Sequence, residues 1–507
     1  MTLSFFKNIL LIILLNLFGA FDKIYSQSNT SSFETKLANA IDLLFNFEFE
    51  KAEIALNKLR IENKHDLKPE LFTLKLYVWK YVGDRSQDDF EKFKTLFDEI
   101  LDKAKKRIHT NEKDYDAYYI LATIYGYRSI MDLMTRNYLN GVFSANKSLS
   151  WAEKLISKKS DYYDAYLWRG IFNFLLTQVP STVRTVLSTL GLSGNLKQGI
   201  NDLKLVTERG TYSKIEAMYF LSQFYSSFLL ENLKAKDLLI DLYQKYPDNE
   251  LFSYSLAAEF LKADLPNEAA KILEQLVSNK KFKIQSLKNF SLFILGDSYY
   301  YQNEFLKAKY YYKKFIELEE QKNYKTTANF RLGVSEFFTA NVEASKKIFA
   351  MNSNQKVTID EDKLYKKFSA NVILKSYDTS LVKIFRTYNL IKSGKYLKAL
   401  EELNELQQLN LKEHSNLIKY YSALSNYKLN RLNEAKKHFI ELIKINETHD
   451  LWIKGFSYLY LGVIELKSGN TTSAKKYWKE LQELKGFEFE NYLKSVARNL
   501  IAYNTNP

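Results

Sequence analysis

The chain has 507 residues, a formal net charge of +14 and an apolar content of 46%, which is more than a disordered chain carries. It contains only 5 prolines and 16 glycines, far below the usual shares of roughly 5% and 7%, so the composition favours long helices over strands. The absence of cysteine excludes disulfides, thiolate metal sites, cysteine nucleophiles and a lipid-modified N-terminal cysteine.

The N-terminus has the pattern of an export signal. Lys7 precedes an apolar run from Ile9 to Phe21, which is shorter than the about 20 residues of a membrane-spanning helix and normal for a signal-peptide core. We predict a signal peptide over residues 1–26 and a flexible N-terminus over 27–34. An exported chain of this size without cysteine suggests the periplasm or cell envelope of a bacterium. An uncleaved N-terminal membrane anchor is the alternative.

A repeated pattern of small residues runs through most of the chain. Alanines that each follow a turn and open an apolar pattern of helical spacing are Ala235, Ala269, Ala308, Ala344, Ala399, Ala435 and Ala474. Small residues twelve positions before four of them are Ala257, Gly296, Ala423 and Gly462. The period, at or just above 34 residues, is that of the tetratricopeptide repeat. We therefore predict an all-α fold, a solenoid of helical hairpins in a superhelix like that of tetratricopeptide repeats.

The repeat pattern predicts several regions along the chain. Residues 35–210 form a degenerate N-terminal helical region, in which a long helix from about Asn137 to Lys158 is the second helix of a hairpin. The predicted regions that follow are a repeat array over 211–352, an insertion with an extra short helix over 353–377, a second array over 378–486, and a capping helix and tail over 487–507.

One passage, "GIFNFLLTQVPSTVRTVLSTLGLSGNLKQGI", departs from the repeats. Pro180 is expected to end a helix near Gln178, because proline lacks an N–H group and clashes with the preceding turn. Gly194 is expected to take a positive φ, and Asn195 to cap the next helix. We predict two inserted helices here, a hairpin over residues 179–194.

This passage resembles the signature of the tetratricopeptide repeat protein 39 family, which is not known as an enzyme family. The matching residues are Gly170, Phe172, Asn173, Pro180, Gly191, Ser193, Gly194 and Gly199. The resemblance implies a helical-repeat architecture and an apolar site around residues 172–192, where Phe172, Phe174, Leu187 and Leu190 would contact lipid or a membrane surface. Plain packing between helices is the alternative for these four side chains.

In a tetratricopeptide array the first helices of the hairpins line a concave face. The repeat register places on that face Tyr254, Lys262, Phe293, Tyr300, Tyr301, Phe330, Phe337, Tyr420, Tyr427, Lys428 and Lys467. Aromatic rings offer rigid contact area, and lysines can meet acidic side chains or a C-terminal carboxylate. Because adjacent helical positions point about 100° apart, we expect the triplets Tyr299–Tyr301 and Tyr310–Tyr312 each to leave a ring exposed.

No catalytic motif accompanies these repeats. The histidines, which are His65, His109, His414, His438 and His449, form no metal-binding spacing, and no phosphate-binding loop or nucleic-acid motif is present. We therefore expect no enzyme activity, no metal, no cofactor and no nucleic-acid partner. The sequence predicts an exported scaffold that binds a protein or peptide in the bacterial cell envelope. The alternative is a lipid- or glycan-binding helical-repeat module. The oligomeric state is not indicated.

Overall fold

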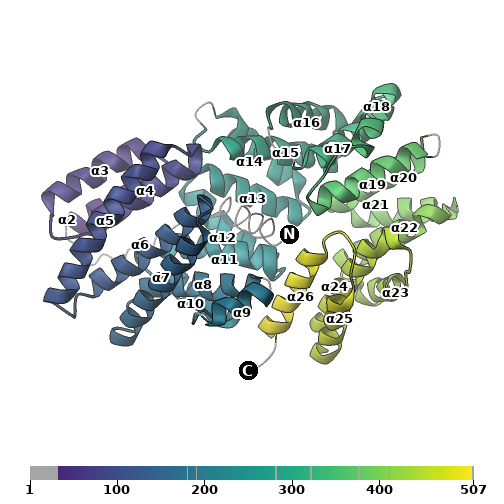
Figure 1. Ribbon diagram of the computed structural model, residues 1–507. Helices are drawn as coiled ribbons and strands as arrows, with labels where there is room; N and C mark the ends of the chain where they lie inside the picture. Colours follow the sequence, from purple (N-terminus) through teal and green to yellow (C-terminus); the bar gives the residue numbers. More distant parts are fainter. Residues whose placement is uncertain are drawn as a thin grey trace. The chain divides into compact units, whose positions relative to one another are not determined.

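The computed structural model describes residues 32–179, 181–189, 191–279, 282–319, 323–374, 377–409 and 411–504. The described residues form helices and no strand, and most helices are joined in pairs by short turns (Figure 1). The predicted all-α fold of helical hairpins is confirmed. Among these residues, no helix has both the length and the hydropathy that a membrane crossing requires. The predicted signal peptide lies outside the described residues.

The chain divides into two compact units. Unit 1 contains the residues up to Ser227 together with Leu233–Leu256 and Lys281–Leu287, and unit 2 contains Phe228–Asn232, Ala257–Lys280 and the residues from Lys288 onward. The division passes through α13 (Glu250–Lys262) and α15 (Gln285–Tyr301), and unit 2 also takes the last residue of the helix that ends at Phe228 and the first residue of the helix that begins at Asn232.

The remaining helices of unit 1 are α2 (Ser32–Phe45), α3 (Phe49–Glu62), α4 (Lys68–Asp84), α5 (Gln87–Thr110), α6 (Tyr115–Met134), α7 (Tyr138–Lys158), the 3₁₀ turn η1 (Tyr163–Ala165), α8 (Tyr166–Gln178), α9 (Ser181–Thr189), α10 (Leu196–Arg209), α11 (Lys214–Phe228) and α12 (Asn232–Lys245). The long second helix expected from about Asn137 to Lys158 is α7.

The remaining helices of unit 2 are α14 (Pro266–Ser278), α16 (Phe305–Leu318), α17 (Lys325–Phe338), α18 (Val342–Ser353), α19 (Asp360–Leu374), α20 (Thr379–Lys392), α21 (Tyr396–Gln408), η2 (Lys412–His414), α22 (Ser415–Lys428), α23 (Leu432–Leu442), η3 (Thr448–Asp450), α24 (Leu451–Lys467), α25 (Thr471–Glu483) and α26 (Glu490–Asn504). The extra helix α19 falls in the segment predicted as an insertion, and α26 follows the last hairpin.

The turn inside each hairpin is built in the same way. One residue just after the first helix takes a left-handed conformation, and these residues are Phe47, Arg85, Arg136, Leu230, Asp264, Asn303, Ala340, Gly394, Asn430 and Gly469. In the turn at Asn303, the next residue, Glu304, donates its N–H to the carbonyl of Tyr299 at 2.9 Å, which closes the helix end. Because most of these residues are not glycine, packing around each turn must offset the cost of the left-handed backbone.

Small residues let the two helices of a hairpin approach closely, as the repeat spacing predicts. A Cβ atom added to Gly462 on α24 would lie 2.1 Å from the Nε1 atom of Trp478 on α25. A Cβ atom added to Gly296 on α15 would lie 2.8 Å from the Tyr312 ring on α16. Ala435 and Ala474 are fully buried. The small residues therefore set the spacing within the hairpins.

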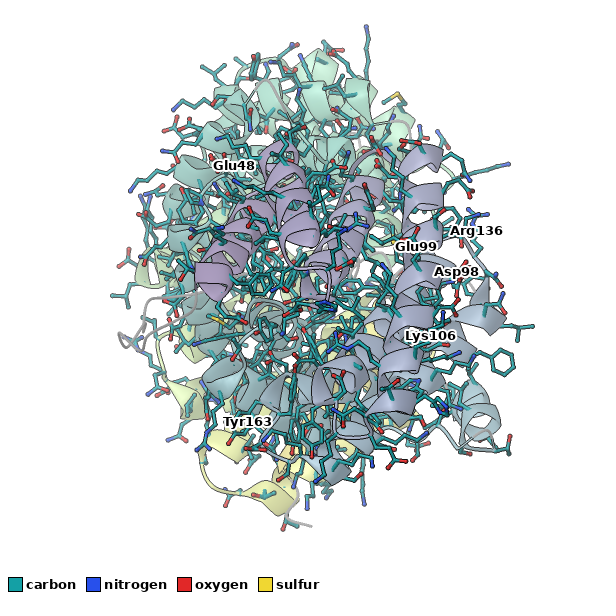
Figure 2. All side chains as sticks on the ribbon, turned by 90° about the vertical axis from the view of Figure 1, so that its left-hand side faces the viewer. Glu48, Asp98, Glu99, Lys106, Arg136 and Tyr163 are labelled. Atoms are coloured by element: carbon teal, nitrogen blue, oxygen red, sulfur yellow. The ribbon has the colours of Figure 1, made fainter. Side chains whose placement is uncertain are left out.

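The outward faces of the helices carry charges of both signs. Figure 2 shows this on α5, where the exposed residues Asp98, Glu99 and Lys106 lie on the solvent side. Lysines on such faces often pair with acids one turn away, as Lys92 does with Asp88 at 2.6 Å. Such exposed pairs contribute little to stability, and their mixed signs are typical of a solvated surface.

Enlarging a small residue at a hairpin crossing should destabilise the fold. We expect Gly462→Val to lower the free energy of unfolding by about 1–3 kcal/mol, because the added methyl groups overlap the buried indole of Trp478. Urea unfolding followed by circular dichroism measures this change. The control is Ser473→Ala at an exposed position of α25, which should change stability by less than about 0.5 kcal/mol. Equal effects of the two substitutions would contradict the close packing.

Candidate functional site

Most aromatic residues predicted to line a concave binding face are core residues. Phe293, Tyr300, Tyr301, Phe330 and Tyr420 are each less than 9% exposed. The ring of Phe330 packs against those of three other helices, and Tyr301 lies against a tyrosine of α20. These five side chains could touch a partner only if the array opened.

Packing from several neighbouring helices also explains why the expectation that the triplet Tyr299–Tyr301 leaves a ring exposed is wrong. Tyr299, Tyr300 and Tyr301 are all buried, at 5%, 1% and 8% exposure, because α15 has protein on every side: the Tyr299 ring stacks on Tyr311 of α16. In the second triplet Tyr310 is 52% exposed, as expected.

The other predicted contact residues reach the surface. Lys262, Lys428 and Lys467 are exposed, and Tyr254, Phe337 and Tyr427 are half-buried. Within unit 2 the structure brings several of them together at the C-terminal ends of α13, α22 and α24. The ammonium group of Lys467 lies 4.6 Å from the centre of the Tyr427 ring, and Lys428 follows Tyr427 on α22. Phe337, by contrast, packs against Phe338 and Tyr377.

A buried carboxylate holds these helix ends together. Asp264, in the left-handed turn after α13, is 2% exposed. Its Oδ1 accepts from the Nζ of Lys392 at 2.5 Å, and its Oδ2 lies 2.6 Å from the Nζ of Lys428. The hydroxyl of Tyr396 donates to Oδ2 at 3.0 Å. We call Asp264, Lys392, Tyr396, Tyr427, Lys428 and Lys467 the Asp264 cluster.

The Asp264 cluster is a strongly polar site with little solvent. Burial alone would raise the pKa of Asp264 above its ordinary 3.8, but Lys392 and Lys428 outweigh burial and hold the pKa below that value. Burial lowers the pKa of Lys392, against the attraction of Asp264. Two lysines contact Asp264 and a third, Lys467, lies over the Tyr427 ring, so the six side chains of the cluster carry more positive than negative charge.

Two further tyrosines, on α24 and α26, lie in the electrostatic surroundings of the cluster. Tyr492 on α26 is 43% exposed, and loss of solvent together with Glu259 nevertheless raises its pKa to about 12. The ring of Tyr460 on α24 lies 5.1 Å from that of Tyr427, centre to centre, and Tyr460 interacts electrostatically with Asp264 and Tyr492.

Sequence reasoning missed Asp264, Lys392 and Tyr396. The repeat register assigns positions within one hairpin and its neighbours, whereas Asp264 and Lys392 are 128 positions apart. The only local signal is the turn position of Asp264, which is occupied in other hairpins by residues as different as Phe47 and Ala340.

The passage that departs from the repeats is a tight helix crossing. Gly170 on α8 faces Gly199 on α10, and a Cβ atom added to Gly199 would lie 2.8 Å from the carbonyl oxygen of Gly170. The side chain of Asn173 accepts from the N–H of Asn195, which in turn caps α10 by accepting from Gln198. The signature residues Gly170, Asn173 and Gly199 therefore have structural roles here.

Two details of that passage differ from the sequence prediction. The positive φ belongs to Gly191, at +77°, and not to Gly194. Gly194 is required for another reason, since a Cβ atom there would lie 2.7 Å from the backbone nitrogen of Thr177. A single helix, α9, occupies the segment in place of two inserted helices. The predicted helix breaker Pro180 lies outside the described residues.

The side chains proposed for apolar contact in this passage point into the protein. Phe174 is fully buried and stacks on Phe224 of α11 with the ring centres 3.7 Å apart. Phe172 and Leu187 are each 7% exposed. Leu190 lies outside the described residues. The described part of the segment thus presents none of these three side chains to lipid.

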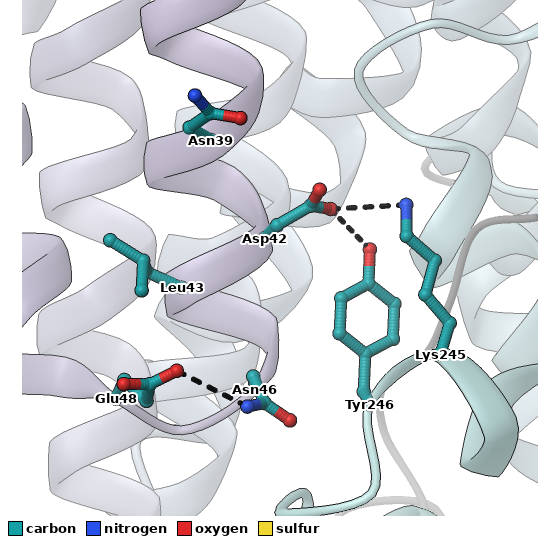
Figure 3. Close-up of a pocket in the computed structure, with 7 residues that line it drawn as sticks. All are labelled: Asn39, Asp42, Leu43, Asn46, Glu48, Lys245 and Tyr246. Carbon is teal, nitrogen blue, oxygen red and sulfur yellow. Dashed lines mark hydrogen bonds and ion pairs between the residues drawn. The ribbon is translucent and has the colours of Figure 1, made fainter. Parts of the chain in front are cut away.

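A cleft of about 370 Å³ opens elsewhere in unit 1, between α2 and the end of α12 (Figure 3). Asp42 accepts from the hydroxyl of Tyr246 at 2.6 Å and pairs with Lys245 at 3.1 Å. Asn46 donates to Glu48 at 3.3 Å. Asp42 and Lys245 already satisfy each other's charge. The residues that line the cleft therefore connect the first hairpin to the end of α12.

No group of histidine and carboxylate side chains among the described ranges is arranged to hold a metal ion. The closest pairing of histidine with an acid joins the Nε2 atom of His414 and the Oδ2 atom of Asp378 at 2.7 Å. Asp378 also accepts from the N–H of Ser380 and caps α20. This pair therefore fixes the start of a helix.

Comparisons with known proteins agree with the fold. Residues 165–369 match the family model described as Iml2/Tetratricopeptide repeat protein 39. The match confirms the resemblance to the tetratricopeptide repeat protein 39 family that was carried by residues such as Gly170, Asn173 and Gly199. It extends that resemblance to residue 369. No curated protein matches the chain.

Several solved structures are similar to the chain at low identity. The tetratricopeptide repeat domain of P58(IPK) is 15% identical, with 80% of this chain and 94% of that chain covered and a TM-score of 0.20. The apo form of RapI is 12% identical, with coverages of 80% and 99% and a TM-score of 0.30. Human IFIT1, as a dimer with m7Gppp-AAAA, is 14% identical, with coverages of 94% and 93% and a TM-score of 0.26. Scores this low support no conclusion on what this chain binds.

The Asp264 cluster should give the chain a specific acid sensitivity. Because the pKa of Asp264 is lower in the folded chain than its ordinary 3.8, its stabilising effect is complete above about pH 4 and is lost as the pH falls through the folded value. We expect Asp264→Asn to be less stable than the wild type at pH 6, with the gap closing as the pH falls below the ordinary carboxyl range. Urea midpoints at each pH measure this, and a constant gap would contradict the assignment.

Proposed function

We propose that the chain is an exported, non-catalytic helical-repeat scaffold of the bacterial cell envelope, and that it binds an acidic segment of a protein or peptide at the Asp264 cluster. The observation that carries the proposal is the excess of ammonium groups there. Lys392 and Lys428 share one carboxylate. Across the described ranges Lys467 has no carboxylate partner and lies over the ring of Tyr427.

An acidic partner fits this charge balance. Opposite charge near an interface speeds encounter and selects among partners, and its effect is largest where solvent is already reduced. Lys428 and Lys467 reach the surface while Lys392 is largely covered, so a carboxylate can approach from outside. The half-buried ring of Tyr427 adds an apolar contact beside the ammonium group of Lys467.

The alternative, a lipid- or glycan-binding module, has less support. Its main argument is the apolar set in the passage that departs from the repeats. Phe172, Phe174 and Leu187 are buried there, so they do not offer a contact surface in this arrangement.

A non-catalytic role is supported by how the carboxylates are used. Asp297 and Glu216 are buried partners of Arg331 and Lys75, and Asp264 is the partner of Lys392 and Lys428. Catalysis needs a titratable group aimed at a reacting atom, whereas these carboxylates satisfy the charges of neighbouring helices.

Export is supported by the N-terminal sequence. Lys7 and the apolar run from Ile9 to Phe21 have the layout of a signal peptide. The absence of cysteine from the whole chain suits an envelope protein that does not depend on disulfides. An N-terminal membrane anchor is the alternative for the same segment.

Neutralising the exposed lysines should weaken binding of an acidic peptide. We expect the purified chain to bind a fluorescent ten-residue glutamate peptide more tightly than the matched glutamine peptide. The double change Lys428→Gln and Lys467→Gln should weaken this binding about tenfold, equivalent to about 1.4 kcal/mol. Fluorescence anisotropy at low and at physiological salt measures the affinity.

The control is Lys271→Gln on α14, an exposed lysine that pairs with Glu268 outside the cluster. It should leave the affinity unchanged. Equal binding of the two peptides by the wild type would contradict the proposed partner class, and equal losses in both variants would place the binding elsewhere.

Removal of residues 1–26 should abolish export. In a bacterial host that secretes proteins, the full chain is expected in the envelope fraction, and its mature form is expected to begin near Gln27. The shortened chain should remain in the cytoplasm. Fractionation with N-terminal sequencing distinguishes the outcomes: an envelope protein with an intact N-terminus would favour the anchor, and a cytoplasmic full chain would contradict export.

A further inference from the structure

The turn that carries Asp264 is held against the ends of two distant helices. The ammonium group of Lys392 donates to the carbonyl of Leu261 at 3.1 Å as well as to Asp264, so it closes the end of α13. The two turns also touch through their backbones, since a Cβ atom added to Gly394 would lie 3.5 Å from the carbonyl oxygen of Asp264. The contact is therefore a turn-to-turn joint centred on one carboxylate.

This joint covers aromatic residues of the inner face. Lys392 lies 5.8 Å from the centre of the Tyr301 ring, and Tyr301 packs edge-on against Tyr388 of α20. Tyr301 is 8% exposed. If the turn at Asp264 moved away from α20, Tyr301 would be among the first inner residues to reach solvent.

The joint also occupies the group that an acidic partner would need. Both oxygens of Asp264 are used, and Lys428, the more exposed of its two lysine partners, is engaged through Oδ2. A carboxylate from outside would compete with Asp264 for Lys428. Competition for a shared group couples two equilibria, and the coupling must act equally in both directions.

We propose that Asp264 is an autoinhibitory latch: it partly neutralises the cluster, keeps the turn after α13 closed on α20 and α22, and is loosened when an acidic partner takes Lys428. This inference rests on the proposed function, because it describes how the same site is regulated. A purely structural carboxylate would behave differently, since its loss would weaken binding by disordering the site. Loss of a latch strengthens binding.

The test compares Asp264→Asn with the wild type in the full chain. We expect the variant to bind the ten-residue glutamate peptide about tenfold more tightly. Hydrogen exchange should rise at least tenfold in the turns at Asp264 and Gly394 and at the end of α22. In the wild type, saturating glutamate peptide should raise exchange in the same turns, whereas the glutamine peptide should not.

Two further variants keep the test decisive. Glu268→Gln on α14 removes an exposed carboxylate that pairs with Lys271 outside the cluster, and it should change neither affinity nor exchange. Tyr396→Phe removes only the hydroxyl that donates to Asp264, so it should tighten binding about two- to threefold even if Asp264→Asn fails to fold.

The outcomes separate the two proposals. The latch would be overturned if the wild type binds the glutamate peptide but neither Asp264→Asn nor Tyr396→Phe binds it more tightly. The proposed function would then still stand. If the wild type and the variants bind the glutamate and glutamine peptides with equal affinity, both the latch and the proposed function are overturned. Tighter binding together with faster exchange in the named turns would support the latch.

Discussion

Each unit is organised around a charged pair that is buried where the first helices of its hairpins converge. In unit 1, Lys75 of α4 pairs with Glu216 of α11, and the hydroxyl of Tyr127 on α6 donates to the same carboxylate at 3.0 Å. In unit 2, Arg331 of α17 pairs with Asp297 of α15 at 2.5 Å. Separating such a pair strands an uncompensated charge in a dry interior, which costs several kcal/mol. The helices that carry these groups therefore cannot slide or spread independently.

This constraint explains where binding can occur. A repeat array usually offers the inner faces of its first helices to a partner, but here those faces hold the charged pairs and the rings of Tyr300 and Phe330. Among the residues that the repeat register assigns to this face, the exposed polar ones are Lys262, Lys428 and Lys467, each the last residue of its helix, and the ends of α13 and α22 meet at Asp264. The helix C-termini gathered there carry partial negative charge, which helps to explain why Lys392, Lys428 and Lys467 are the last residues of α20, α22 and α24.

The repeat architecture could be predicted from the sequence because it depends on local spacing. Alanines and glycines at fixed intervals are enough to define hairpins, and Gly296 and Gly462 lie against Tyr312 and Trp478 as that spacing requires. How tightly an array curves depends on small rotations added over many hairpins, which no single residue reports. The contact of Tyr301 with Tyr388 and the meeting of Asp264 with Lys392 depend on how such rotations add up within unit 2, so they could not be predicted. The glycines of the departing passage could be recognised from the sequence, but their roles in a helix crossing depend on where α8 and α10 meet in space.

The long-range joint at Asp264 also bears on how unit 2 folds. An array with contacts only between neighbouring repeats can fold piece by piece, and it tolerates the loss of a terminal repeat. A contact between residues 128 positions apart raises the contact order and forms only after the hairpins between its ends are in place. The hairpins between Asp264 and Lys392 are then expected to fold as one cooperative unit, because removing one of them would change the distance that the joint must span. A hairpin inserted into this stretch or deleted from it would therefore disturb the joint, a sensitivity that solenoids with only neighbour contacts lack.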